Sequence, residues 1–149
     1  MKEILFGAAY YLEYMPYDRL KEDLDMMQQA GMNTIRIAES TWSTLEPTDG
    51  EFDFSYIDRV LEEAQKRKMN VIIGTPTYAI PSWLEKKCPE VMVYNKEGRA
   101  RYGHRQIMDI MHPVFRKYAE RAICKLAEHT AAHPSVIGFQ IDNETKHYG

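Results

Sequence analysis

Four short apolar segments, separated by stretches with helical periodicity, constrain the fold of this chain more than any other feature of its sequence. They cover residues 4–8, 34–38, 71–75 and 136–141. Each has the length of a strand and is apolar throughout, which is typical of a parallel sheet covered by helices. After the first segment, Leu20, Leu24 and Met27 recur at the spacing of one helix face. The sequence therefore predicts repeated strand-helix units.

Residues with known preferences for helix ends mark the helices between these strands. Asp18 can cap the first helix, and Gly31 is the stop signal expected just past its end. Ser55 and Asp58 resemble a capping box at the start of a second helix, which ends near residue 69. Pro113 stands at the first position of a third helix, where proline is tolerated. Strands and helices are thus expected to alternate, ending on the fourth strand.

Polar side chains collect directly after the strands, and this decides between two folds with the same order of elements. These residues are Tyr10, Tyr11, Glu39, Trp42, Thr75, Thr77, Asn143 and Glu144. A TIM barrel keeps its active site at the carboxyl ends of its strands. The doubly wound alternative is disfavoured, because no glycine-rich phosphate loop follows the first strand. Since a complete barrel has eight strands, we expect residues 1–149 to form the first half of a TIM barrel, truncated after strand four, with two unpaired edges.

Charge and cysteine usage exclude several classes of function. Acidic and basic residues are interleaved with a net charge of -3, so no basic stripe would attract nucleic acid or an anionic membrane. A neutral or weakly polar substrate fits better. Cys88 and Cys124 lie far apart without metal-ligand spacing, which predicts reduced thiols in a cytoplasmic protein.

The tripeptide Asp142-Asn143-Glu144 closes the fourth strand and carries the strongest catalytic signal. Glu144 suits the acid/base of a glycosidase, which protonates a leaving oxygen, and the Asn143 amide suits a neighbouring sugar hydroxyl. The structural alternative is that Glu144 caps a following helix or pairs with Lys146. Glycoside hydrolysis generally uses two carboxyl groups, and no other residue of the chain is convincingly the nucleophile.

Glu39 and Arg105 are the other polar candidates at this edge of the sheet. Glu39 follows the second strand, either as a second carboxylate in the mouth or as a buried partner of Arg36 or Arg105. Arg105 lies in a long connection, residues 76–112, which predicts a binding loop with a short helix at 82–87. Its guanidinium either donates to sugar hydroxyls or belongs to an ordinary surface arginine.

Aromatic rings near the predicted mouth offer flat apolar faces to a sugar, although such rings more often fill cores. They are Tyr10, Trp42, Tyr78, Trp83 and Tyr102. Tyr10 and Trp42 are our substrate-binding candidates among them, because they follow the first and second strands.

Histidine spacing gives only a weak indication of a metal site. His129 and His133 have the i, i+4 spacing of a helical metal pair, but the glutamate of a His-Glu-x-x-His motif is missing. Both also lie at a helix end. We therefore expect no metal and no cofactor.

Several segments, in order along the chain, resemble the N-terminal part of the catalytic barrel of the family 42 glycoside hydrolases, which are β-galactosidases. They are residues 33–39, 42–47, 50–54, 74–77, 81–84 and 140–144. The resemblance covers essentially the whole chain and implies a retaining, exo-acting TIM-barrel enzyme that removes terminal β-linked galactose. It also implies that Glu144 is the acid/base, Asn143 a sugar ligand and Arg105 a substrate-binding arginine.

The same resemblance implies what the chain lacks. The family's nucleophile is a second glutamate after the seventh strand, which these residues do not reach, so we expect the 149 residues alone to be inactive. Some members carry a cysteine-rich zinc site, but Asp109 stands where one such cysteine would fall and no cysteine follows Glu144. Two alternatives remain open: a non-catalytic half-barrel module that self-associates through its strand edges, and a retaining β-glycosidase with another sugar specificity.

Overall fold

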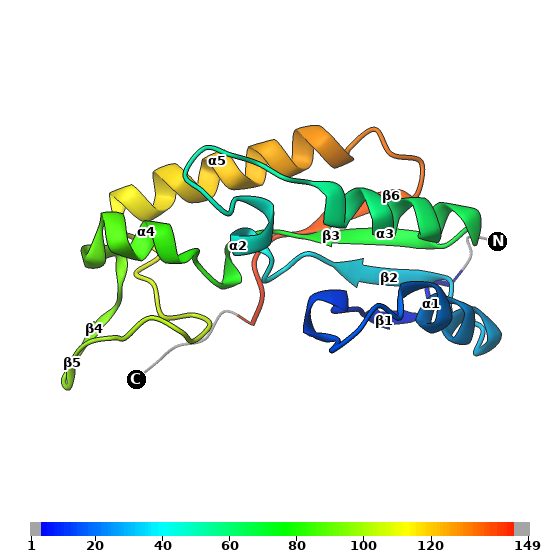
Figure 1. Cartoon of the computed structure of the whole chain (residues 1–149), viewed down its shortest axis with the longest axis horizontal. Coiled ribbons are helices and arrows are strands. Elements are labelled where there is room, and N and C mark those ends of the chain that lie inside the picture. Colours follow the sequence, from blue (N-terminus) through cyan, green and yellow to red (C-terminus); the bar gives the residue numbers. More distant parts are fainter. Residues whose placement is uncertain (1–3, 145–149) are drawn as a thin grey trace.

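The computed structural model describes residues 4–144 and contains a four-stranded parallel sheet in the order β1-β2-β3-β6 (Figure 1). The strands are β1 (Gly7–Ala9), β2 (Thr34–Ile37), β3 (Asn70–Gly74) and β6 (Val136–Gln140). All neighbours pair in parallel, with one irregularity between Val71 and Ile72. The predicted parallel sheet is confirmed, although the first strand begins three residues later than expected.

Three long helices follow the first three strands of the sheet and cover one of its faces (Figure 1). They are α1 (Leu20–Gln29), α3 (Ser55–Lys66) and α5 (Pro113–Thr130). Arg19 is the N-cap residue of α1, and Asp18, one residue before it, accepts a hydrogen bond from the Leu20 N–H. The apolar core between helices and sheet includes Leu24, Ile35, Ile57, Val71, Ile73 and Leu126. Burial of these apolar side chains is the main force that holds the two layers together.

The start of α3 differs from the sequence prediction. Phe54 is its N-cap residue, and the Asp53 carboxylate accepts a hydrogen bond from the Ser55 N–H at 2.9 Å. Ser55 and Asp58 therefore do not form a capping box, because the helix begins one residue earlier than that box requires. Asp58 lies instead 2.5 Å from the ring nitrogen of His129 on α5.

The connections contain shorter elements, of which the sequence predicted only α4. They are η1 (Leu12–Tyr14), α2 (Trp42–Leu45), η2 (Pro76–Tyr78), α4 (Ser82–Lys87), η3 (Pro89–Val91), β4 (Tyr94–Asn95) and β5 (Gly98–Arg99). A second apolar core joins several of them to α5. Its members include Trp42, Ile80, Leu84, Val91, Met92, Phe115 and Tyr118. This core packs the long connection between β3 and α5 against the rest of the molecule.

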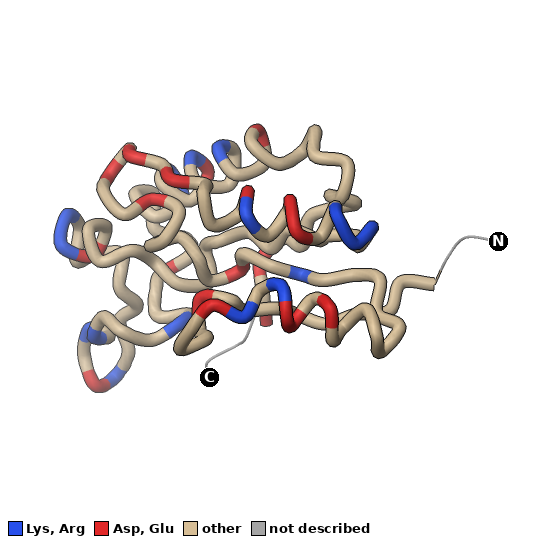
Figure 2. The backbone as a smooth tube through the Cα atoms, turned by 45° about the vertical axis from the view of Figure 1, so that its right-hand side comes forward, with Lys and Arg blue, Asp and Glu red and all other residues tan. Residues whose placement is uncertain are grey.

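Over the residues that the structure describes, acidic and basic residues are interspersed rather than gathered on one element (Figure 2). Within residues 4–144, no helix is long and apolar enough to cross a membrane. Cys88 and Cys124 are both free thiols. Nothing in this distribution of charge indicates a nucleic-acid or membrane partner.

The face of the sheet that points away from the helices is open. Residues paired in register project from the same face, and one row across the sheet consists of Ala9, Arg36, Ile72 and Gly138. In the described part of the chain, β1 and β6 each have a neighbour on one side only. The predicted unpaired edges are therefore present in this structure.

Gly74, the last residue of β3, is packed directly against Glu39. We predict that Gly74→Ala lowers the free energy of unfolding by about 1 to 3 kcal/mol, as for other overpacked sites. An added Cβ would lie 2.8 Å from the Glu39 Cβ. Urea unfolding followed by circular dichroism measures the change. Gly138→Ala is the matched control, since nothing lies within 4 Å of its added Cβ, and equal stability of the two variants would contradict the prediction.

Candidate active site

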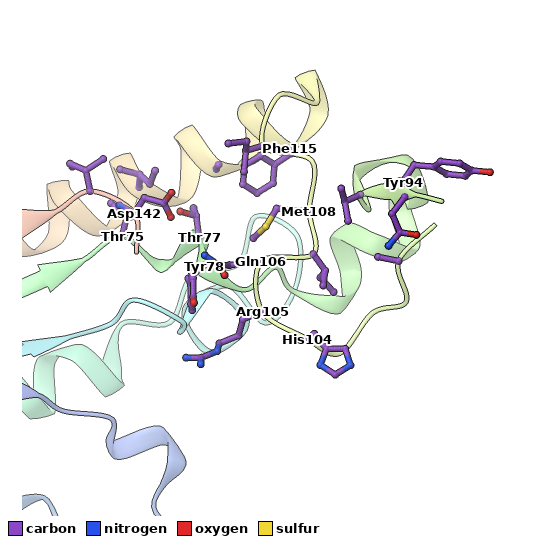
Figure 3. Close-up of a pocket in the computed structure, with 18 residues that line it drawn as sticks. Thr75, Thr77, Tyr78, Tyr94, His104, Arg105, Gln106, Met108, Phe115 and Asp142 are labelled. Carbon is purple, nitrogen blue, oxygen red and sulfur yellow. Dashed lines mark hydrogen bonds between the residues drawn. The ribbon is translucent and has the colours of Figure 1, made fainter. Parts of the chain in front are cut away.

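Backbone and side-chain hydrogen bonds fix the turn after β6 to the end of β3. The Thr75 N–H donates to the Gln140 carbonyl at 3.0 Å, and the Asp142 N–H donates to the Thr75 hydroxyl at 2.9 Å. Figure 3 shows Thr75 and Asp142 next to each other. The 142–144 turn is therefore held at the carboxyl edge of the sheet, where barrel enzymes place their catalytic groups.

Glu144 is held at two points by the connection between β3 and α5. The Tyr78 hydroxyl donates to Glu144 Oε2 at 2.8 Å. The Gln106 side-chain amide donates to the Glu144 carbonyl at 2.6 Å and to the Asn143 carbonyl at 3.3 Å. The side chain and the backbone of Glu144 are thus both positioned by residues far from it in sequence.

The Asn143 side chain is oriented by Gln140, the last residue of β6. The Gln140 amide nitrogen donates to Asn143 Oδ1 at 3.0 Å and to the Asp142 carbonyl at 2.7 Å. Its own oxygen accepts a hydrogen bond from Arg36 on β2. Because the Asn143 oxygen already accepts a hydrogen bond from Gln140, the remaining hydrogen-bonding capacity of the amide is mainly that of its N–H donors. Such donors suit a ligand with acceptor oxygens.

Glu39 is a buried carboxylate with a counter-charge. Its side chain is 2% exposed, and Oε2 lies 2.6 Å from an Arg36 guanidinium nitrogen, in an ion pair without hydrogen-bond alignment. The Tyr11 hydroxyl donates to Oε1 and accepts from the same arginine. Of the two partners expected from the sequence, Arg36 is confirmed, and Arg105 lies elsewhere.

The two phenols at this edge donate to carboxylates and remain protonated. Burial, followed by the hydrogen bond to Glu39, raises the pKa of Tyr11 above its usual value. Burial and the hydrogen bond to Glu144 raise the pKa of Tyr78 in the same way, while Arg105 and Asn143 lower it. Each hydroxyl is therefore a stable neutral donor at physiological pH.

Left-handed backbone conformations gather around the site. Four non-glycine residues here have positive φ: Ala38 at 81°, Gln106 at 56°, Asp142 at 59° and Glu144 at 40°. Only one other such residue, Lys68, occurs within residues 4–144. Non-glycine residues adopt this region at a cost that surrounding contacts must offset, and such strain is common at functional sites.

Tyr10 and Trp42 lie in the core rather than at the mouth, which corrects their predicted position. Tyr10 is 3% exposed, and its hydroxyl donates to Asp23 on α1. Trp42 has no exposed surface, and its indole N–H donates to Glu46 at 2.8 Å. At the end of β1, successive side chains point to opposite faces, so Tyr11 reaches the mouth and Tyr10 does not.

Three residues that shape the site were not among the sequence-based site candidates, although the sequence places Tyr11 directly after the first strand. Tyr11 and Gln140 had a signal, since period-two alternation along β1 and β6 places both on the open face of the sheet. Gln140 is also the one amide within β6, whose other residues are apolar or glycine. Gln106 had no local signal, because its contact with Glu144 depends on the path of a long loop.

A cavity of about 780 Å³ opens beside the turn (Figure 3). Its lining combines polar side chains from the strand ends and the long connection with apolar side chains. The lining includes Thr75, Thr77, Tyr78, Arg105, Asp142, Met108 and Phe115. The Arg105 guanidinium lies 4.9 Å from the centre of the Tyr78 ring. The volume of the cavity falls in the usual range of small-molecule sites.

The histidine pair does not form a metal site in the described chain. Between residues 4 and 144, no three His, Cys, Asp or Glu residues are grouped so that they could hold a metal ion. The His129 ring stacks on Phe54, with 4.3 Å between ring centres. Lys146, which the sequence suggested as an ion-pair partner of Glu144, lies outside the described residues.

Parallel strand-helix units with a held glutamate at the carboxyl edge are the features expected of a segment of a barrel enzyme of the glycosidase type. The model of family 42 of the glycoside hydrolases, described as β-galactosidase, matches residues 9–148. The chain belongs to this family.

Named relatives agree with the family assignment. The chain is 37% identical over 141 residues to a β-galactosidase of Thermus thermophilus. This match covers 94% of this chain and 22% of the relative. It is 36% identical over 145 residues to β-galactosidase YesZ of Bacillus licheniformis, and this match covers 97% of this chain and 22% of the relative. This chain therefore spans about a fifth of the length of the curated relatives it matches.

Solved structures agree as well. A β-galactosidase from Rahnella sp. R3 superimposes with a TM-score of 0.90 at 31% identity, over 99% of this chain and 22% of that one. A β-galactosidase from the psychrophilic Marinomonas ef1 superimposes with a TM-score of 0.86 at 34% identity, over 95% of this chain and 22% of that one. The predicted fold class, parallel βα units of a TIM barrel, is confirmed.

The Arg36–Glu39 pair generates a prediction about stability. Arg36→Met leaves the Glu39 charge buried without a counter-ion, so we expect the free energy of unfolding to fall by about 3 kcal/mol. Adding Glu39→Gln to this variant removes the uncompensated charge and recovers part of the loss. Urea titrations of the single and double variants measure both effects. Unchanged stability of Arg36→Met would show that the pair contributes nothing.

Proposed function

We propose that this chain carries the acid/base half of a retaining β-galactosidase site, with Glu144 as proton donor and base. The observation that supports this most directly is the position of Glu144, in a turn held at the carboxyl edge of the sheet, in a chain of family 42. Its contacts with Tyr78 and Gln106 are made by the protein itself, so the fold supplies the orientation of the group.

The proposed reaction is a double displacement. Glu144 first protonates the glycosidic oxygen while a second carboxylate attacks the anomeric carbon, and it then activates the water that releases the sugar. Glu39 is the nearest alternative for the attack, but Arg36 and Tyr11 contact its two oxygens. We therefore assign the attack to a carboxylate outside residues 4–144, and Glu39 to the wall of the sugar site.

The proposed substrate is a terminal β-linked galactose. Asn143 and Arg105 are suited to donate hydrogen bonds to its hydroxyls, since Gln140 engages the Asn143 oxygen and leaves the amide to act as a donor, and Arg105 is exposed at the cavity. The support for galactose over other sugars is the name that the relatives carry. Tyr10 and Trp42 support the wall from the core and are not proposed as ligands.

We also propose that the protein works in the cytoplasm. The support is that Cys88 and Cys124 are both free, and that Cys124 is exposed. Exposed thiols persist in reducing compartments and are readily oxidised elsewhere.

A second candidate function, a self-associating half-barrel module, is favoured by the apolar surface at the two sheet edges. Ile4 and Phe6 beside β1 are 85% and 50% exposed, and Ile137 and Phe139 on β6 are 46% and 40% exposed. Unpaired strand edges flanked by apolar side chains tend to pair with another chain. This surface fits a second copy of the same chain.

The acid/base assignment predicts a specific chemical rescue, measured on the protein at the full length that its gene encodes. Glu144→Ala should lower kcat/KM on an aryl β-galactoside with a poor leaving group by about 100-fold or more. Substrates with an activated leaving group should lose less, because they need no proton. On the activated substrates, added azide should restore turnover by attacking the glycosyl-enzyme in place of water, which releases the enzyme carboxylate and yields β-galactosyl azide, detected by NMR. Glu62→Ala on the exposed face of α3 is the control, and absence of rescue would contradict the assignment.

The second candidate predicts a concentration-dependent dimer of the 149-residue chain in sedimentation velocity. Phe139→Lys should shift the chain toward the monomer, because a charge at a strand edge opposes pairing. Met26→Lys on α1, where the side chain is 55% exposed, is the matched control and should leave the dimer intact. A monomer at all concentrations would count against this candidate.

A further inference from the structure

Tyr78 is placed so that it contacts Glu144 directly and also supports a second contact with it. It is the last residue of η2, it is 3% exposed, and its hydroxyl donates to Glu144 Oε2 at 2.8 Å. Its carbonyl accepts the Gln106 N–H at 3.0 Å. The Gln106 side chain in turn donates to the Glu144 carbonyl. Tyr78 is therefore connected to both ends of the glutamate.

The Tyr78 ring is itself fixed. Pro76 opens η2 with a restricted φ, and the ring is buried in the wall of the cavity. The Arg105 guanidinium lies over the ring at 4.9 Å, within the range of a cation-π contact (Figure 3). A hydroxyl on a fixed ring can hold an acceptor in one orientation at little further entropy cost.

We propose that Tyr78 is a positioning residue that holds Glu144 Oε2, so that Oε1 is the oxygen that exchanges the proton with the substrate. This inference rests on the proposed acid/base role of Glu144. A carboxyl group has two oxygens in a rigid plane, so fixing one of them fixes the direction of the other. Tyr78 does not touch the reacting atoms and acts only through Glu144.

The contact has a second consequence, for the proton affinity of Glu144. A hydroxyl that donates to a carboxylate favours its ionised form, so removing the hydroxyl should raise the pKa of Glu144. The other groups facing this site are the Arg105 guanidinium from the long connection, Asp142 in the same turn, and the Arg36–Glu39 pair at the end of β2. None of these charges changes when the hydroxyl alone is removed.

The test is an NMR titration of the Glu144 carboxyl carbon in the 149-residue chain, with and without Tyr78→Phe. We expect the variant to raise the pKa of Glu144 by about one unit, which corresponds to one hydrogen bond to a charged group. Tyr94→Phe is the matched control, because it deletes the same atom from a side chain that is 76% exposed and points away from Asp142 (Figure 3). That control should leave the titration unchanged.

A second variant makes the test independent of any loss of folding in Tyr78→Phe. A fluorinated tyrosine at position 78 keeps the hydroxyl and makes it a stronger donor, so the pKa of Glu144 should fall. An unchanged Glu144 titration in both folded variants would overturn the proposal.

The enzymatic readout separates this proposal from the proposed function. In the full-length protein, Tyr78→Phe should move the alkaline limb of the kcat/KM profile to higher pH by the same amount as the NMR shift. A merely structural role would lower the rate without moving this limb, and that result would overturn the inference alone. Failure of the azide rescue, with the NMR shift present, would overturn the proposed function instead.

Discussion

The ion pair between Arg36 and Glu39 is the interaction on which the rest of the candidate site depends. It lies at the end of a central strand, and its members reach toward both outer strands. Glu39 is contacted by Tyr11 after β1, and Arg36 donates to Gln140 on β6. Because a buried carboxylate without a counter-charge is costly, these four side chains fix one another. The strand ends are therefore held together by charge as well as by the backbone ladder.

A second buried carboxylate plays a comparable part behind the cavity. Glu46 has no exposed surface, and it accepts hydrogen bonds from the Trp42 indole and from the Gly50 N–H, both at 2.8 Å. It also pairs with Arg121 on α5, whose guanidinium lies against the Tyr118 ring. The connection after β2 is thus fastened to the helix that lines the cavity. Functional groups keep their geometry when the elements behind them are fixed in this way.

Hydrophobic periodicity was sufficient to predict the parallel sheet and the long helices, because burial dictates both. Position after a strand was also sufficient to place Glu144 at the carboxyl edge. Position after a strand alone did not separate Tyr10 from Tyr11, because the period-two alternation along β1 is also needed to tell which of them faces the mouth. Trp42 was misplaced because α2, a single short turn, carries its indole into the second core. The contact of Tyr78 with Glu144 joins residues 66 apart and has no local signature.

The glutamate and the side chains that hold it are encoded on separate stretches of the chain. Tyr78 and Gln106 belong to the connection between β3 and α5, whereas Glu144 follows β6. Connections vary among relatives more readily than strand ends do. A Tyr78 that sets the proton affinity of Glu144, as proposed, would let the working pH change through this connection, by exchange of a residue that takes no part in bond breaking.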